Sequence, residues 1–332
     1  MLLLALLVAS NNAWSTNAQT RRSVTSNPGN SNLLESLPAS DALFIVKMKR
    51  VINEALPKLL AGNATKLAEA NAQIEQLKSQ TGVDLRSFDQ IALSMRYTYP
   101  APGITKVNTV AIANGSFNAG AFAAAGRVAA NGKYREEKYQ GKTIYLFALD
   151  QQVRFFGLIN LKIQDLAVCP LEGNKLALGN LQGVRDAIDA GKGRNRSNAE
   201  LIALATRDPN ALAGFGGNIS PTMMENLRIT NDAIARDLTA VRQVYGTVGM
   251  TDKDLELMLA ARTVDPSSAK NLGDTIEGLK QFGALFVNRL PAAKSTLARS
   301  ALGNLKITTQ GNELQIRTAV AQAEVVPLMA SL

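Results

Sequence analysis

The chain has 332 residues, of which 46% are hydrophobic and 19% are charged, and its formal net charge is +9. These proportions are typical of globular proteins and exclude a wholly disordered chain. The absence of histidine excludes Ser-His-Asp and Cys-His catalysis and nearly every catalytic zinc site. With a single cysteine, a disulfide within the chain and a redox cysteine pair are excluded as well. We therefore expect no catalytic, metal-binding or cofactor-binding residue, and a protein that is not an enzyme.

The first 18 residues predict a signal peptide. The apolar run over residues 2–9 is shorter than the roughly 20 residues of a membrane-spanning helix. Thr16 and Ala18 are small residues at positions −3 and −1 of a signal peptidase site, so we expect cleavage after Ala18. No basic residue precedes the run, and the alternative is a buried N-terminal strand or helix. Export predicts an extracytoplasmic protein, periplasmic or secreted, without a transmembrane span in the mature chain.

Residues 19–33 are rich in small polar residues, glycine and proline, and they predict a flexible linker. A first folded half is expected over residues 34–198. Its expected strands are 42–46, 91–99, 107–113, 134–139, 143–149, 166–171 and 175–178, and its expected helices are 50–60, 64–80 with Gly82 as a cap, 119–130 after a cap within 114–118, and 180–190.

The second half is expected over residues 199–332. Asp265 followed by Pro266 predicts a helix N-terminus, because proline lacks the N–H that would be unpaired there. The apolar stripe of this helix is expected to be buried and consists of Leu272, Ile276, Leu279, Phe282 and Phe286. The other expected elements are strands 210–219, 241–250, 255–264, 305–309 and 314–320 and a helical start at 221–227.

The two halves share one order of elements: a strand, a helical segment, two strands, a helix and a hairpin. The hairpin turns at residues 172–174 and 310–312 are also alike, with the sequences EGN and QGN. Residue identity between the halves is poor, so the match is one of pattern. We predict an α+β fold with two related halves, each an antiparallel sheet packed with helices.

Three segments carry a family resemblance. They are Leu37 to Ala42 (LPASDA), Tyr139 to Tyr145 (YQGKTIY), and Lys175 to Gly179 (KLALG) leading into residues 184–190. Together they resemble a broad family of exported bacterial proteins, often lipoproteins, with a duplicated α+β domain of unknown function. The similarity covers residues 34–332, and its motifs are structural turns. This chain departs from the family in lacking a lipid-anchoring cysteine, and the resemblance implies no activity.

Several local patterns contain residue types found at functional sites, and each favours a structural role. Cys169 lies in an apolar run and is expected to be a buried thiol. Residues 252–256 (DKDLE) suit neither a calcium loop nor a glycosidase pair and predict a solvated turn. Residues 214–217 are not followed by lysine and so form no phosphate loop. Residues 179–183 could bind an anion at a helix start, but an ordinary strand-to-helix turn is favoured.

The predicted function is non-enzymatic binding or scaffolding at the cell envelope. The partner is unknown, and an envelope protein or an anionic envelope surface would suit the positive charge. Nucleic acid is disfavoured because aromatic residues do not interleave with the basic ones. One alternative is a carrier of an apolar or anionic small molecule in a cleft between the halves. A further alternative is a histidine-free hydrolase using Ser-Lys or paired carboxylates.

Overall fold

The computed structural model describes residues 33–81, 84–101, 104–155, 159–225, 232–290 and 292–329. The expected signal peptide (1–18), its cleavage site at Ala18, the linker up to residue 32 and the cap at Gly82 lie outside these residues. The chain divides into two compact units. Unit 1 combines Met1–Ala39, Ala68–Leu93 and Asn108–Arg196, and unit 2 combines Ser40–Leu67, Ser94–Val107 and Ser197–Leu332. Each unit is therefore built from separate stretches of sequence.

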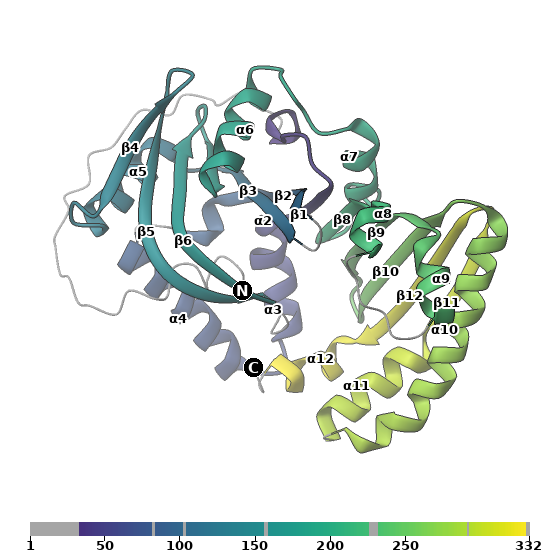
Figure 1. The fold of residues 1–332 in the computed structure, drawn as a ribbon. Coiled ribbons are helices and arrows are strands. Elements are labelled where there is room, and N and C mark those ends of the chain that lie inside the picture. The colour runs from purple at the N-terminus through teal and green to yellow at the C-terminus, as the bar shows by residue number, and fades with distance from the viewer. Residues whose placement is uncertain are drawn as a thin grey trace. The chain divides into compact units, whose positions relative to one another are not determined.

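Unit 1 contains a twisted sheet with the strand order β2-β3-β7-β6-β5-β4, in which the pairs from β3 to β4 are antiparallel (Figure 1). Its elements are η1 (Leu33–Ser36), α4 (Ala64–Thr81), η3 (Leu85–Ser87), β2 (Phe88–Ala101), β3 (Ile104–Gly115), α5 (Ala119–Ala129), β4 (Tyr134–Tyr139), β5 (Lys142–Phe155), β6 (Ile159–Pro170), β7 (Lys175–Gly179) and α6 (Leu181–Gly191). Elements α4, β2 and β3 also contribute residues to unit 2.

Helices α5 and α6 cover opposite faces of this sheet. Successive side chains of a strand point to opposite faces, and Val168 packs in the cluster that includes Ala119 of α5. On the other face, α6 contacts β6 and β7 and donates from Arg185 to Glu137 of β4. Cys169 follows Val168 and is fully buried, as expected, and burial raises the pKa of its thiol to about 11. The thiol is therefore a packing group.

The strands of unit 2 are antiparallel, and neighbouring strands are hydrogen-bonded in the order β11-β12-β10-β9-β8-β1. Its elements are β1 (Ala42–Val46), α2 (Met48–Arg50), η2 (Val51–Ala55), α3 (Leu56–Leu59), α7 (Ala199–Ala205), β8 (Ala213–Asn218), α8 (Pro221–Glu225), α9 (Asp232–Thr239), β9 (Val241–Met250), β10 (Asp254–Thr263), α10 (Pro266–Phe286), η4 (Val287–Arg289), α11 (Ala292–Gly303), β11 (Lys306–Gln310), β12 (Glu313–Ala321) and α12 (Gln322–Met329).

Helix α7 packs on one face of this sheet at its β8 end. A Cβ atom added to Gly214 would lie 2.2 Å from the carbonyl oxygen of Ala205, so only glycine lets the helix backbone come this close. Gly214 and Gly216 thus serve packing against α7. Helix α10 covers the opposite face beside β11 and β12 (Figure 1), where Leu272 packs with Leu314 and Val241.

The prediction of a fully buried stripe on α10 is wrong for its second half. Leu272 is buried and Ile276 packs against it, but Leu279 is 50% exposed and Phe282 is 60% exposed. The reason is that α11, and not the end of α10, contacts the far part of β12, where Thr318 Oγ1 donates to the carbonyl of Ala301 at 2.7 Å. The helical spacing of apolar residues identifies the apolar face of a helix, but it does not identify the element that packs against that face.

The predicted α+β class is confirmed, with antiparallel sheets packed against helices. The expected strands at 42–46 and 134–139 are β1 and β4. The cap expected within 114–118 is Asn118, which accepts a hydrogen bond from the Ala121 N–H, and the expected cap Asp265 accepts from the Ser268 N–H. Helices α7, α9, α11 and α12 have no counterpart among the elements expected from sequence. Among the described helices, none combines the length and hydrophobicity needed to cross a membrane. That the halves are related stays a prediction.

Candidate functional site

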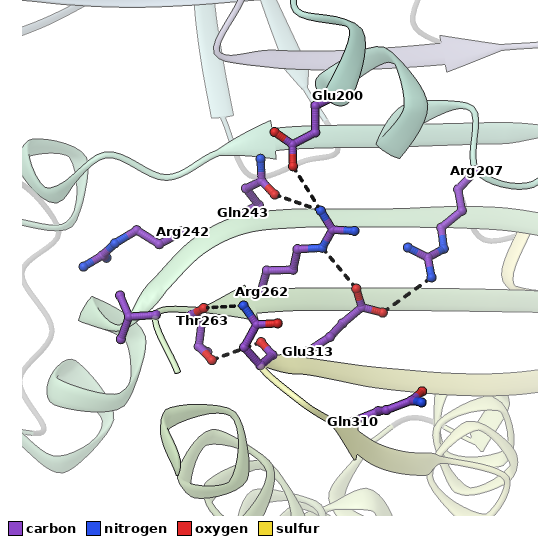
Figure 2. A pocket seen from close by; sticks show the side chains of 10 residues that line it. Glu200, Arg207, Arg242, Gln243, Arg262, Thr263, Gln310 and Glu313 are labelled. Carbon is purple, nitrogen blue, oxygen red and sulfur yellow. Dashed lines mark hydrogen bonds and ion pairs between the residues drawn. The ribbon is translucent and has the colours of Figure 1, made fainter. Parts of the chain in front are cut away.

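A shallow, polar cavity of about 660 Å³ lies beside α7, on the face of the unit 2 sheet against which this helix packs. We call it the arginine cavity, because three arginines and two glutamates line it together with polar neighbours (Figure 2). Its lining residues are Glu200, Arg207, Arg242, Gln243, Arg262, Thr263, Val264, Gln310, Asn312 and Glu313.

Strand register builds the floor of the arginine cavity. Asn218, Gln243, Arg262 and Glu313 stand opposite one another on β8, β9, β10 and β12. Each is hydrogen-bonded to the next: Gln243 Nε2 to Asn218 Oδ1 at 3.0 Å, Arg262 Nη1 to Gln243 Oε1 at 3.2 Å, and Arg262 Nε to Glu313 Oε2 at 3.1 Å. This row of side chains ties four strands together across one face.

Two further groups complete the charge pattern. Glu200, at the start of α7, accepts from Arg262 Nη1 at 3.1 Å with its side chain 54% exposed. Arg207 lies 3.6 Å from Glu313 Oε1, so two guanidinium groups share this one carboxylate. Burial alone would raise the pKa of Glu313. Contacts from Tyr245, Gln315 and Arg262 and the charge of Arg207 outweigh burial, so the pKa lies below its ordinary value.

Tyr245 forms the buried base beneath these charges. The guanidinium carbons of Arg207 and Arg262 lie 4.9 Å and 5.6 Å from the centre of its ring, within the range of cation–π attraction. Its fully buried hydroxyl lies near Glu313 without a well-directed hydrogen bond. Burial and then the Glu313 carboxylate raise the pKa of Tyr245 to about 12, so the ring stays neutral at physiological pH.

A Ser-Lys pair is present elsewhere, in unit 1. Lys175 Nζ donates to Ser36 Oγ at 3.0 Å, which is the contact that a Ser-Lys hydrolase requires. Both residues are buried, however, and neither lines the arginine cavity or the apolar cavity of about 160 Å³ near Phe88 and Phe117. A substrate has no visible route to Ser36, so the pair serves to tie η1 to β7.

The second half of α10 presents a cluster of exposed apolar side chains, which we call the α10 apolar face. The rings of Phe282 and Phe286 are in contact, tilted by 50° with their centres 4.9 Å apart, and Leu285 is 71% exposed. Its members are the exposed large apolar residues of the second half of α10 and of the turn after it: Leu279, Phe282, Leu285, Phe286 and Leu290. Large exposed apolar clusters on soluble proteins mark interaction surfaces.

The α10 apolar face lies in a stretch of sequence that is rich in basic residues. Between Glu277 and Glu313 the chain has no acidic residue, and its five basic residues are Lys280, Arg289, Lys294, Arg299 and Lys306. Arg289 lies over the Phe286 ring at 4.9 Å, and Lys294 is exposed on α11. The sequence signal that points to this surface is the long stretch without carboxylates.

The residues singled out from sequence do not converge on a site. Asp252 pairs with Lys58 at 2.8 Å and precedes β10 in an exposed turn, as expected. At the start of α6, the N–H of Gly183 is taken by the Asn180 side chain at 2.7 Å, so this is the favoured strand-to-helix turn. Among the residues that the structure describes, no group of three or more Cys, Asp and Glu side chains is placed to hold a metal ion.

Comparison with known proteins gives no family. No family model matches the chain, and no curated protein matches it. Among solved structures, crystal form III of TP0453 has a TM-score of 0.46 and 10% identity, over 90% of this chain and 98% of that one. Crystal form I has a TM-score of 0.45 and 9% identity, over 91% and 98% of the two chains. Similarity of this size assigns the chain neither a family nor a function.

Proposed function

We propose that this chain is an extracytoplasmic, non-enzymatic binding protein that attaches to anionic membrane surfaces through the α10 apolar face. The observation that carries the proposal is the exposure of Leu279, Phe282, Leu285 and Phe286 on the second half of a helix whose first half buries Leu272. The predicted signal peptide ending at Ala18 would deliver the chain to the envelope.

Hydrophobic transfer favours insertion of this face into a lipid interface. Burying a Phe or Leu side chain contributes about 1.5–3 kcal/mol, and several such side chains lie together on the α10 apolar face. A helix lying in the plane of the interface needs to bury only one side, so it need not have the length of a spanning helix.

The charge pattern favours anionic lipid as the occupant of this face over a protein groove. Basic residues near an anionic leaflet contribute about 1 kcal/mol each, and Arg289 and Lys294 flank the apolar side chains without an acidic residue between Glu277 and Glu313. An apolar groove on a partner protein would match the aromatic side chains but would not require this absence of carboxylates.

The test is cosedimentation of the full chain with vesicles of phosphatidylglycerol and phosphatidylcholine in equal parts. We expect the double variant Phe282→Ser, Leu285→Ser to bind at least about tenfold more weakly than the wild type, since tenfold corresponds to about 1.4 kcal/mol. Vesicles of phosphatidylcholine alone should bind the wild type weakly, because they offer no anionic headgroups to the basic residues.

The matched control is the double variant Ile104→Ser, Val128→Ser, which removes two exposed apolar side chains outside the α10 apolar face. It should bind the mixed vesicles as the wild type does. Equal binding by the Phe282 and Leu285 variant would refute the proposal and leave a protein partner as the occupant to seek. The carrier of an apolar cargo gains no support from the arginine cavity, whose lining is polar. A cleft between the halves stays a prediction.

A further inference from the structure

A β-bulge shapes the arginine cavity. Gln243 pairs with Arg262 and Val241 pairs with Thr263. Arg242 is therefore an extra residue in β9 that has no residue paired with it in β10. In a regular strand Arg242 and Gln243 would point to opposite faces. Both line the cavity instead, as do the consecutive residues Arg262 and Thr263 (Figure 2). The bulge therefore turns one more cation toward the cavity, and bulges commonly re-aim side chains in this way beside functional sites.

The Arg242 side chain is held in place and keeps spare binding capacity. Its Nη1 atom donates to the carbonyl oxygens of Thr239 at 2.8 Å and Val241 at 3.1 Å, at the end of α9 and the start of β9. Among the side chains that the structure describes, none accepts a hydrogen bond from the rest of its guanidinium group, and no carboxylate lies within ion-pair distance. Carbonyl contacts orient a guanidinium group but leave its charge uncompensated.

The charges of the cavity do not balance. Arg207 and Arg262 share Glu313, and Glu200 at the exposed rim adds a second contact to Arg262. Three arginines therefore face two glutamates, and the excess cation is Arg242. A positive group in a depression lined with amide and hydroxyl groups attracts an oxyanion, because planar guanidinium donors match phosphate and carboxylate oxygens.

We propose that the arginine cavity binds the phosphate or carboxylate group of a polar ligand, with Arg242 as its anchoring cation. The cavity volume of about 660 Å³ lies within the range of small-molecule sites, roughly 300–1,000 Å³. Gln310 also lines the cavity, and its amide makes no hydrogen bond to a described residue, so it can bind a hydroxyl or amide of the ligand. This site is separate from the α10 apolar face and does not depend on it.

The test is isothermal titration of the full chain with inorganic phosphate at low ionic strength. We expect saturable binding that Arg242→Gln weakens at least tenfold and Arg242→Lys weakens less, because lysine keeps the charge. Arg236→Gln is the matched control, since it removes an exposed arginine of α9 outside the cavity, and it should change the affinity by less than twofold. An unchanged circular dichroism spectrum and urea midpoint would establish that the variants fold.

Two arms identify the source of the oxyanion. If Arg242→Gln weakens phosphate binding but leaves binding to phosphatidylglycerol vesicles unchanged, the ligand is a soluble compound. If both decrease, it is a lipid headgroup. Absence of saturable phosphate binding, or an equal loss in Arg236→Gln, would overturn the proposal. The Phe282→Ser, Leu285→Ser variant should still bind phosphate, so failure of the membrane proposal and failure of this one are distinguishable.

Discussion

Helices α6 and α10 are both amphipathic, but the structure treats their apolar faces differently. In α6, which has 11 residues, the apolar face is covered throughout, and Val184, Ala187 and Ile188 are all buried against the unit 1 sheet. In α10, which has 21 residues, burial ends after Gly273, and Phe282 and Leu285 face solvent. The neighbours of α6 therefore cover the whole of its apolar face, whereas the neighbours of α10 cover only the first half of its apolar face.

This difference separates apolar residues that stabilise the fold from those available for binding. Covered residues make dispersion contacts that a substitution would remove, whereas exposed residues have few contacts to lose. Substitutions in α6 should thus change stability, and substitutions in the second half of α10 should change binding alone. The following predictions test that separation, from the largest expected effect to the smallest.

Ile188→Ala should lower the free energy of unfolding by about 2–4 kcal/mol, because it leaves a cavity under α6. Leu285→Ala removes a similar volume from α10, where the side chain is 71% exposed, and should change stability by less than about 0.5 kcal/mol. Urea unfolding monitored by circular dichroism measures both. A comparable loss in the two variants would mean that the α10 apolar face is part of a packed core.

Ser36→Ala should lower the free energy of unfolding by about 1–3 kcal/mol, because the buried ammonium group of Lys175 then loses its hydrogen-bond acceptor. This pair lies where η1 contacts α6, so its loss should weaken the covered helix. Ser79→Ala, which removes an exposed hydroxyl in α4, is the control and should be nearly neutral. Unfolding in urea again gives the comparison, and equal effects would argue against a structural role of the pair.

Glu313→Gln should destabilise unit 2 by about 1–2 kcal/mol at neutral pH, since charge-assisted bonds from Arg262 and Arg207 are weakened. The pKa of Glu313 is held below 4.5 in the folded protein, so its contribution is present above that ordinary value. The contribution is lost as the pH falls through the lower folded-state pKa.

The difference in stability between wild type and Glu313→Gln should therefore shrink in acid below about pH 4.5. Thermal unfolding from pH 3 to pH 7 measures this difference. If the difference in stability stays constant from pH 3 to pH 7, the charge of the Glu313 carboxylate does not stabilise the row of side chains across β9, β10 and β12.

Asn180→Ala should lower the free energy of unfolding by about 1 kcal/mol, because the Asn180 side chain caps the first turn of α6 by accepting a hydrogen bond from the Gly183 N–H. Gln182→Ala, in the same turn with an exposed side chain, should cost less than half as much. Urea midpoints resolve this difference, and equal costs would indicate that the cap does not stabilise the helix.

Sequence reasoning succeeded where the structure depends on neighbours along the chain. The caps at Asn118 and Asp265 and the strand at 42–46 are local features, since a side chain bonds a backbone N–H within a few residues or a short apolar run is bounded by turn residues. Helix α7 was missed because its seven residues follow a polar loop and give little periodic signal.

The candidate sites depend on distant pairings and could not be predicted in the same way. Arg262 meets Glu313 only because β10 pairs with β12, and these residues are 51 positions apart. The bulge that turns Arg242 into the cavity leaves no mark in the local sequence. The exposure of Phe282 depends on α11 covering β12, although the absence of acidic residues from 278 to 312 could have pointed to this surface.

The most direct test of the membrane proposal is a fluorescent label placed on the α10 apolar face. Cys169 is buried, so Leu285→Cys provides the one accessible thiol of the described chain for an environment-sensitive dye such as NBD. The account predicts that emission rises and shifts to the blue when vesicles containing phosphatidylglycerol are added, while a label at Val128→Cys does not respond. An unchanged spectrum at position 285, or an equal response at position 128, would contradict it.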